Sequence, residues 1–205
     1  MDQEQSLWAL PGLRRLRWPL FSPITSIRVL DNGDDDSSSW RPFVQTQNDS
    51  SGEQRHEQQE FHPVAADPVS DPPMSSIVVS RLETVETWIN FWHEIHYTNY
   101  LAEYEPEGGV VGAPCVCCGA RPFKRPDPLE VSASDAPFVT VRDYVAAVHP
   151  WLLGIEEMIL QLSDCSDSLV EGPWMDGYEP TRRRFWVEAR FLNEVILTVN
   201  EQEES

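Results

Sequence analysis

The chain has 205 residues, which is enough for one ordinary domain, and it carries a formal net charge of −19 with Lys124 as its single lysine. Nucleic acid and anionic membrane surfaces are excluded as partners, because Lys and Arg supply the affinity for phosphate groups and an acidic surface repels them. No stretch approaches the ~20 apolar residues that a transmembrane helix needs, and the acidic start MDQEQ does not resemble a secretory signal.

The first 75 residues are predicted to contain little regular structure. Residues 1–30 mix Leu, Trp and Pro with four arginines against two acidic residues, and we interpret them as a weakly structured arm. The alternatives are a docking peptide or an organelle-targeting arm. Residues 31–75 are polar, acidic and rich in proline, so they cannot bury enough apolar surface to offset the entropy of ordering. We predict that this second segment is disordered.

Residues 76–200 are predicted to form a single α+β domain, followed by an acidic tail at 201–205. Ser80 and Glu83 have the spacing of a capping box. Apolar residues then recur every three or four positions, which predicts an amphipathic helix over about 80–104. The proline-rich residues that follow, up to about 137, are predicted to be an irregular loop.

A second helix is predicted over 140–163, where the apolar periodicity is the strongest in the chain. Thr140 and Asp143 have capping-box spacing at its start, and Pro150 should kink or break it because proline removes one backbone hydrogen bond. The segment 181–199 fits both a helix and an alternating strand, and its β-branched and aromatic residues favour a strand that turns near Asn193. The predicted fold class is therefore α+β, with two main helices and a small C-terminal strand element.

Two segments of this predicted domain, PCVCCGA and FVTVRDYVAAVHPWL, resemble a lineage-restricted family of uncharacterised filamentous-fungal proteins. The resemblance covers roughly residues 76–200. It implies a shared domain, and it brings neither an activity nor site residues with it.

The cysteines form the most distinctive local pattern. Cys115 and Cys118, followed by a glycine, have the spacing of a metal knuckle, in which two thiolates bind one ion above a tight turn. A tetrahedral zinc site needs two further ligands, for which the candidates are Cys117, Cys165, His93, His96 and His149. Two other interpretations stay open: cysteines packed as small hydrophobic side chains, and a redox pair.

The histidines and a run of arginines offer weaker signals. His93 and His96 lie near the apolar stripe of the first helix, so we expect core histidines there. His149 precedes Pro150 and is expected to bind backbone groups that the proline leaves unpaired. The run Arg182–Arg184 is expected to pair with the protein's own carboxylates; the alternative is that it binds an acidic peptide or a phosphate.

The sequence contains no glycine-rich phosphate loop and no recognisable catalytic constellation. We therefore predict a non-enzymatic, soluble protein that acts through contacts with a protein partner. A small domain with a structural Zn²⁺ site is the alternative, and an enzyme ranks third. Four cysteines without a secretory signal favour a reducing, intracellular compartment, either cytoplasm or nucleus.

Overall fold

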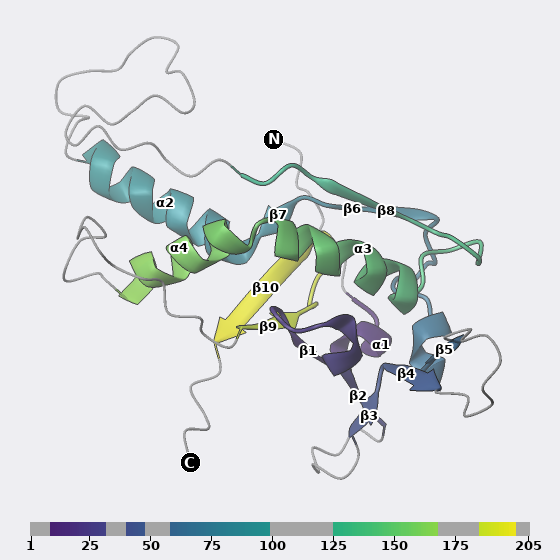
Figure 1. The fold of residues 1–205 in the computed structure, drawn as a ribbon. Helices are drawn as coiled ribbons and strands as arrows, with labels where there is room; N and C mark the ends of the chain where they lie inside the picture. Colours follow the sequence, from purple (N-terminus) through teal and green to yellow (C-terminus); the bar gives the residue numbers. More distant parts are fainter. Residues whose placement is uncertain (1–8, 32–39, 48–57, 99–124, 168–184, 200–205) are drawn as a thin grey trace, which may run out of the picture.

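The computed structural model describes residues 9–31, 40–47, 58–98, 125–167 and 185–199 (Figure 1). Its strands are β1 (Leu16–Pro19), β2 (Arg28–Leu30), β3 (Trp40–Pro42), β4 (Val44–Gln47), β5 (Gln58–Phe61), β6 (Ser76–Val79), β7 (Arg81–Leu82), β8 (Leu129–Ser132), β9 (Phe185–Glu188) and β10 (Glu194–Val199). Its helices are α1 (Pro11–Arg14), α2 (Glu83–Thr98), α3 (Val141–Gly154) and α4 (Glu156–Asp167), with short 3₁₀ helices η1 (Ile24–Ser26) and η3 (Pro63–Ala66).

A six-stranded sheet in the order β3-β2-β1-β9-β10-β7 forms the centre of the fold. Its pairs are antiparallel except for β10 with β7, which are parallel. In the middle of the sheet Trp18 lies opposite Val187, so strands from the two ends of the chain are direct neighbours. In Figure 1 α3 and α4 cross one face of this sheet.

The predicted fold class is wrong in two respects. The strands are not a small C-terminal element, because β9 and β10 belong to the six-stranded sheet and two further two-stranded sheets, β4–β5 and β6–β8, accompany it. The first 75 residues are also not mostly unstructured, since their described parts hold α1, η1, η3 and β1 to β5. The sheet thus joins strands from both sides of the boundary predicted at residue 76.

The N-terminal strands are too short for their alternation of buried and exposed residues to be recognised in the sequence. β1 to β3 have only three or four residues each, and β1 and β3 both end in proline, so no long alternation is visible. Within β1 the alternation is nevertheless strong: Trp18 is 1% exposed, whereas Arg17 points to solvent. Burial of Trp18, Val29 and Val187 on one face supplies the hydrophobic free energy that the polar segment as a whole lacks.

The helices differ from their predicted bounds for local reasons. α2 begins at Glu83 rather than near Ser80, because Arg81 and Leu82 pair with β10 before the helix starts. The capping box of Thr140 and Asp143 is confirmed at the start of α3. Pro150 lies within α3 without ending it, and the break comes at Ile155, where α3 stops and α4 starts anew.

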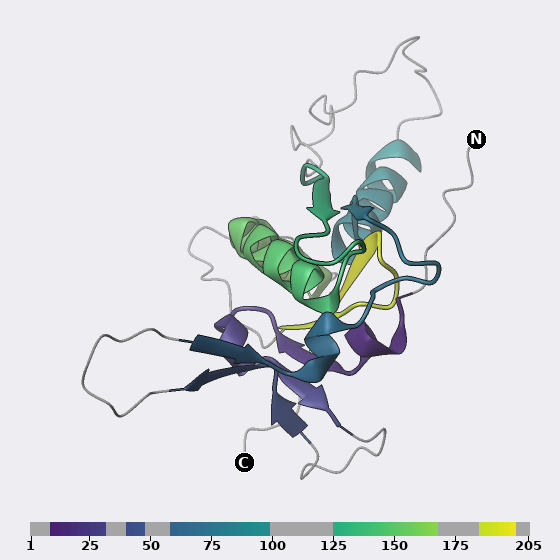
Figure 2. The same ribbon diagram turned by 90° about the vertical axis from the view of Figure 1, so that its right-hand side faces the viewer.

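Two small sheets border the central one. β6 pairs antiparallel with β8, which packs against α3. β4 pairs with β5, and Figure 2 shows this hairpin extending away from the rest of the protein. The hairpin is attached at its base, where the rings of Phe43 and Phe61 meet edge to face with centroids 5.9 Å apart, a spacing typical of aromatic pairs.

Two glycines provide a test of this packing. A Cβ on Gly12, in α1, would lie 3.3 Å from Val141 Cγ2 and 3.4 Å from Val64 Cγ2, both on buried side chains. We expect Gly12→Ala to destabilise the protein by about 1 kcal/mol through overpacking. A Cβ on Gly154 would meet nothing within 4 Å, so Gly154→Ala should stabilise it by roughly 0.5 kcal/mol. Thermal unfolding followed by circular dichroism measures the melting temperature of both variants. Equal changes in melting temperature would contradict the packing of α1 against α3.

Candidate functional site

The predicted zinc knuckle cannot be placed in space. Cys115, Cys117 and Cys118 lie outside the described residues. Cys165 lies on α4, and His93 and His96 lie on α2, in stretches where the backbone alone is described. Across the described part of the chain no three His, Cys, Asp or Glu side chains gather in a way that would hold a metal ion. The zinc site therefore stays a prediction.

His149 lies in the core rather than at a metal or catalytic site. Its ring is 6% exposed, and its Nδ1 accepts a hydrogen bond of 3.0 Å from the indole Nε1 of Trp18, 131 positions away in the chain. The sequence suggested that His149 binds carbonyls left unpaired by Pro150. The backbone group that it contacts is instead that of Ser22. Burial lowers the pKa of His149, and the Ser22 hydrogen bond opposes that effect. A neutral imidazole with both nitrogens engaged joins α3 to β1, and its Nδ1 lone pair is not free for a metal.

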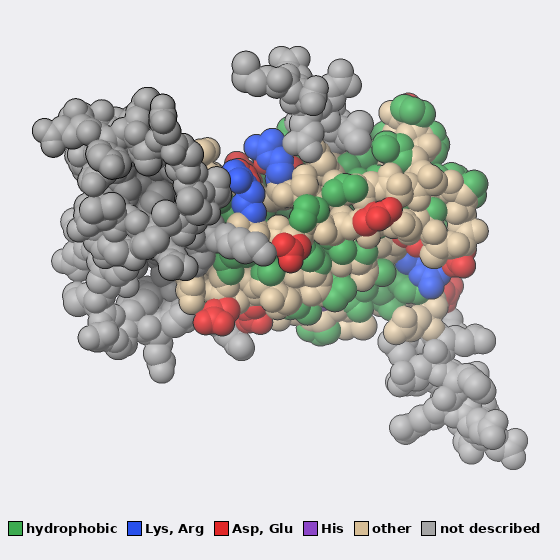
Figure 3. Space-filling model, turned by 90° about the horizontal axis from the view of Figure 1, so that it is seen from above, with side chains coloured by type: hydrophobic (Ala, Val, Ile, Leu, Met, Phe, Trp, Pro, Cys, Tyr) green, Lys and Arg blue, Asp and Glu red, His purple; other side chains and the backbone are tan. Residues whose placement is uncertain are grey.

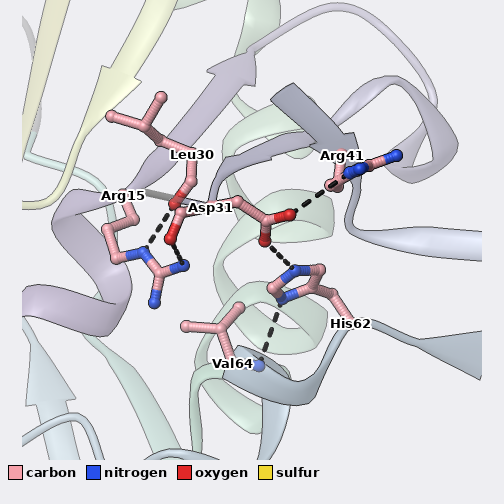
Figure 4. A network of polar contacts seen from close by, with 6 residues as sticks. All are labelled: Arg15, Leu30, Asp31, Arg41, His62 and Val64. Atoms are coloured by element: carbon pink, nitrogen blue, oxygen red, sulfur yellow. Dashed lines mark hydrogen bonds and ion pairs between the residues drawn. The ribbon is translucent and has the colours of Figure 1, made fainter. Parts of the chain in front are cut away.

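A cluster of charged side chains surrounds Asp31 at the end of β2 (Figure 4). Asp31 Oδ1 lies 2.9 Å from His62 Nε2, and its Oδ2 accepts a hydrogen bond of 3.2 Å from Arg41 Nε. Arg15 donates to the backbone carbonyls of Leu30 and Asp31, at 2.7 Å and 3.0 Å. The hydrogen bond from His62, followed by that from Arg41, holds the pKa of Asp31 below its usual value.

An Asp–His pair of this kind is the supporting half of a catalytic triad, but here the second ring nitrogen is occupied. His62 Nδ1 accepts a hydrogen bond of 3.2 Å from the backbone N–H of Val64 and thereby caps η3. With Nδ1 accepting, Nε2 carries the proton and donates to Asp31. The imidazole is thus committed on both sides, and no nitrogen remains to take a proton from a nucleophile. The Asp31 cluster ties β2, β3 and η3 together.

Asp143 is a second carboxylate whose acceptors are all used by the fold. Its Oδ2 accepts from the backbone N–H and the hydroxyl of Thr140, at 2.9 Å and 2.7 Å, and its Oδ1 accepts from the Ser134 hydroxyl. Burial raises its pKa, but these hydrogen bonds outweigh burial and leave the pKa lowered. The side chain is 9% exposed and caps α3, so it has no capacity for a ligand.

The face of the sheet that points away from α3 carries the most unusual group of side chains, which we call the Arg–Trp face and define as Arg17, Arg28, Trp40 and Trp186. The guanidinium carbon of Arg17 lies 4.6 Å from the ring centroid of Trp186 on β9 and 5.8 Å from that of Trp40 on β3. Such cation–π contacts fix an otherwise flexible side chain. Arg28 lies directly opposite Arg17 in the register of β1 and β2, and both side chains are exposed.

Two like charges directly opposite each other on neighbouring strands destabilise a sheet. Within the described ranges, neither arginine has a carboxylate within ion-pair distance, although the chain has 34 acidic residues against 15 basic ones. The acidic side chain on β9, Glu188, is bound by Arg190 at 2.8 Å. In addition, the indole N–H of Trp186 is buried without an acceptor in the described part of the structure. The Arg–Trp face therefore presents the positive charge of two exposed arginines that no described carboxylate neutralises.

The sequence did not predict this face, because Arg17 and Arg28 were interpreted as part of a weakly structured arm over residues 1–30. The signal was present in the alternation of Arg17 with the buried Trp18, and of Arg28 with the buried Val29. The neighbouring run Arg182–Arg184 lies outside the described residues.

Comparison with known proteins adds no relative: no protein-family model, curated protein or solved structure matches the chain. Among the described residues, no helix combines the length and the apolar character that crossing a membrane requires.

The Asp31 cluster is expected to act on stability. We expect His62→Ala to destabilise the protein by about 1 kcal/mol, because η3 loses its cap and Asp31 loses a donor. The pKa of Asp31 is lowered in the folded protein. Its contribution to the free energy of unfolding is therefore complete above the ordinary carboxyl pKa and is lost as the pH falls through the lower folded pKa. Chemical unfolding should therefore show that Asp31→Asn lowers the free energy of unfolding by less at acidic pH than at neutral pH. An equal loss at both pH values would contradict the pairing of Asp31 with His62.

The contact between Trp18 and His149 predicts a second pH dependence. Because the folded protein holds the pKa of His149 below that of an unfolded chain, the unfolded state takes up a proton first as the pH falls below ~6.5, and the free energy of unfolding decreases. His149→Gln keeps an acceptor for Trp18 but does not titrate. Its unfolding free energy should depend less steeply on pH between about 7 and 5 than that of the unmodified chain. Identical slopes would show that His149 does not carry the effect.

Proposed function

We propose that this protein is a non-enzymatic binding protein whose Arg–Trp face recognises an acidic segment of a partner protein. The observation that carries the proposal is the pair of exposed arginines, Arg17 and Arg28, held opposite each other on adjacent strands with no described carboxylate beside them. An anionic group that approaches both side chains relieves their repulsion, so the free energy lost in the unbound sheet is recovered on binding.

The geometry of Arg17 suits this role. Trp186 and Trp40 both contact its guanidinium, which limits its rotamers before a ligand arrives. A pre-organised guanidinium donates paired hydrogen bonds to a carboxylate with a smaller loss of side-chain entropy than a free arginine or lysine. The apolar surface of the two tryptophans offers additional contact area beside the charge.

Charge argues for a short acidic segment rather than a long polyanion. The chain has a net charge of −19, so nucleic acid would be repelled by the surface beyond the Arg–Trp face. A few carboxylates on an extended peptide match a patch of two arginines without meeting that repulsion. This arrangement supports recognition by a non-enzymatic protein. The histidines support the same conclusion, because the rings of His62 and His149 are held in hydrogen bonds within the fold.

The proposal is tested by fluorescence anisotropy of the full chain with a short, labelled poly-aspartate peptide at low and high salt. We expect binding that weakens with salt, and a loss of affinity of roughly three- to tenfold for Arg17→Ala and for Arg28→Ala, the range for exposed to well-oriented charged hydrogen bonds. Arg17→Lys should recover part of the loss, because it keeps the charge but not the planar fork.

Arg14→Ala is the matched control, since it removes the same charge from an exposed side chain on α1. It should leave the affinity close to that of the unmodified chain. Equal losses for Arg14→Ala and Arg17→Ala would mean that the peptide responds to overall charge, and an absence of binding at low salt would reject the proposed function.

A further inference from the structure

The two exposed arginines of the Arg–Trp face lie close enough to bind one anion together. Arg17 and Arg28 are direct partners in the antiparallel register of β1 and β2. Side chains directly opposite each other on antiparallel strands leave from the same face of the sheet, with their Cβ atoms about 4.5–5.5 Å apart. Both side chains are exposed, so the two guanidinium groups can reach the same group of a ligand.

Carboxylates neutralise most of the other arginines in the described residues. On the face drawn in Figure 3, basic side chains lie beside acidic ones. The carboxylate of Glu188, on β9, is bound by Arg190 Nε at 2.9 Å and by its Nη2 at 2.8 Å. Ion pairs of this kind are formed by Arg41, Arg81, Arg125, Arg142 and Arg190. Arg17 and Arg28 together thus carry two positive charges that no described carboxylate matches.

We infer that the acidic group recognised by the Arg–Trp face is the phosphate of a phosphorylated serine or threonine in a partner protein. The inference rests on the proposed function and names the chemistry of its ligand. A phosphate monoester carries a charge of about −1.5 to −2 at neutral pH and has three strong acceptor oxygens. Its charge matches that of Arg17 and Arg28 together, and its oxygens can accept hydrogen bonds from both guanidinium groups at once.

Carboxylates match this pair of arginines less well. A single carboxylate carries one negative charge and two oxygens, and one arginine in bidentate geometry already engages both oxygens. Two carboxylates on an extended peptide point to the same side only when one residue separates them, which places those residues about 6.4–6.8 Å apart. That spacing is wider than the separation expected for the Cβ atoms of Arg17 and Arg28. One phosphorylated residue therefore fits the pair better than two acidic residues do.

The tryptophans and the charge of the chain favour a protein segment as the source of the phosphate. The guanidinium carbon of Arg17 lies 4.6 Å from the ring centroid of Trp186 and 5.8 Å from that of Trp40, so residues that flank a bound phosphate meet an apolar surface. Nucleic acid and anionic lipid surfaces would be repelled by the net charge of −19. A free phosphate ion would gain nothing from the two rings.

Fluorescence anisotropy of the full chain with three labelled peptides of one sequence tests the inference. The peptides carry phosphoserine, aspartate or unmodified serine at the central position of an otherwise uncharged sequence. We expect the phosphoserine peptide to bind roughly tenfold more tightly than the aspartate peptide at neutral pH, because its second charge and third oxygen engage the second arginine. Inorganic phosphate should displace the phosphoserine peptide only at a concentration well above that of the peptide itself.

The pH dependence of binding separates a phosphate from a simple negative charge. The second pKa of phosphoserine is about 6, so lowering the pH from about 7.5 to about 5.5 removes most of its second negative charge and should weaken binding several-fold. The aspartate peptide keeps its charge over this range, because the ordinary pKa of aspartate is about 3.9. It therefore reports any change in the protein itself.

Substitution of one arginine provides the structural comparison. Arg28→Gln should reduce the preference for phosphoserine over aspartate to about threefold or less, because one guanidinium remains. Arg14→Gln, on α1, is the matched control and should keep the full preference. Far-UV circular dichroism confirms that both variants are folded.

The outcomes distinguish this inference from the proposed function. If poly-aspartate binds through Arg17 and Arg28 but phosphoserine is not preferred over aspartate, the inference is overturned and the proposed function stands. A preference that Arg28→Gln leaves unchanged, or inorganic phosphate that binds as tightly as the phosphoserine peptide, would also overturn it. If none of the acidic peptides binds at low salt, the proposed function is rejected and the inference with it.

Discussion

The fold depends on the position of β1 in the middle of the sheet. β1 pairs with β2 on one side and with β9 on the other, so it joins the N-terminal strands to the C-terminal ones. Trp18 stabilises β1 in this position, because its side chain is almost completely buried and its indole N–H donates a hydrogen bond to His149 on α3. Removing either partner of such a buried hydrogen bond leaves a polar group unpaired, at a cost of about 1–3 kcal/mol. One side chain therefore links the sheet to the helical layer that covers it.

The same strand determines what the outside of the protein presents. Side chains alternate along a strand, so burial of Trp18 directs Arg17 to the opposite face. The register of β1 with β2 then puts Arg28 beside Arg17, and the neighbouring strands add Trp186 and Trp40. A packing requirement in the core thus assembles a surface of arginine and tryptophan from three separate parts of the chain.

Most of the polar groups that might have carried chemistry are used by the structure. His62 caps η3 and binds Asp31, His149 binds Trp18, and Asp143 caps α3. In the described residues two buried polar atoms, the indole nitrogen of Trp186 and the side-chain oxygen of Asn193, have no hydrogen-bond partner, and the exposed arginines Arg17 and Arg28 leave positive charge on one face of the sheet.

The sequence by itself determined the features that depend on neighbours in the chain. The capping box of Thr140 and Asp143 was predictable from spacing alone, as was helical structure after Glu83 and along α3, because hydrogen bonds and side-chain periodicity over a few residues decide them. The strand character of β9 and β10 was predicted from their β-branched and aromatic residues, since the spacing there fitted a helix as well. The central sheet was not predictable in this way. β1 to β3 are too short to show a pattern, and they are stable because partners such as β9, more than 160 residues away, complete their hydrogen bonds and cover Trp18. The role of His149 and the Arg–Trp face were decided by the tertiary structure for the same reason, since each is made by residues that only the folded sheet brings together.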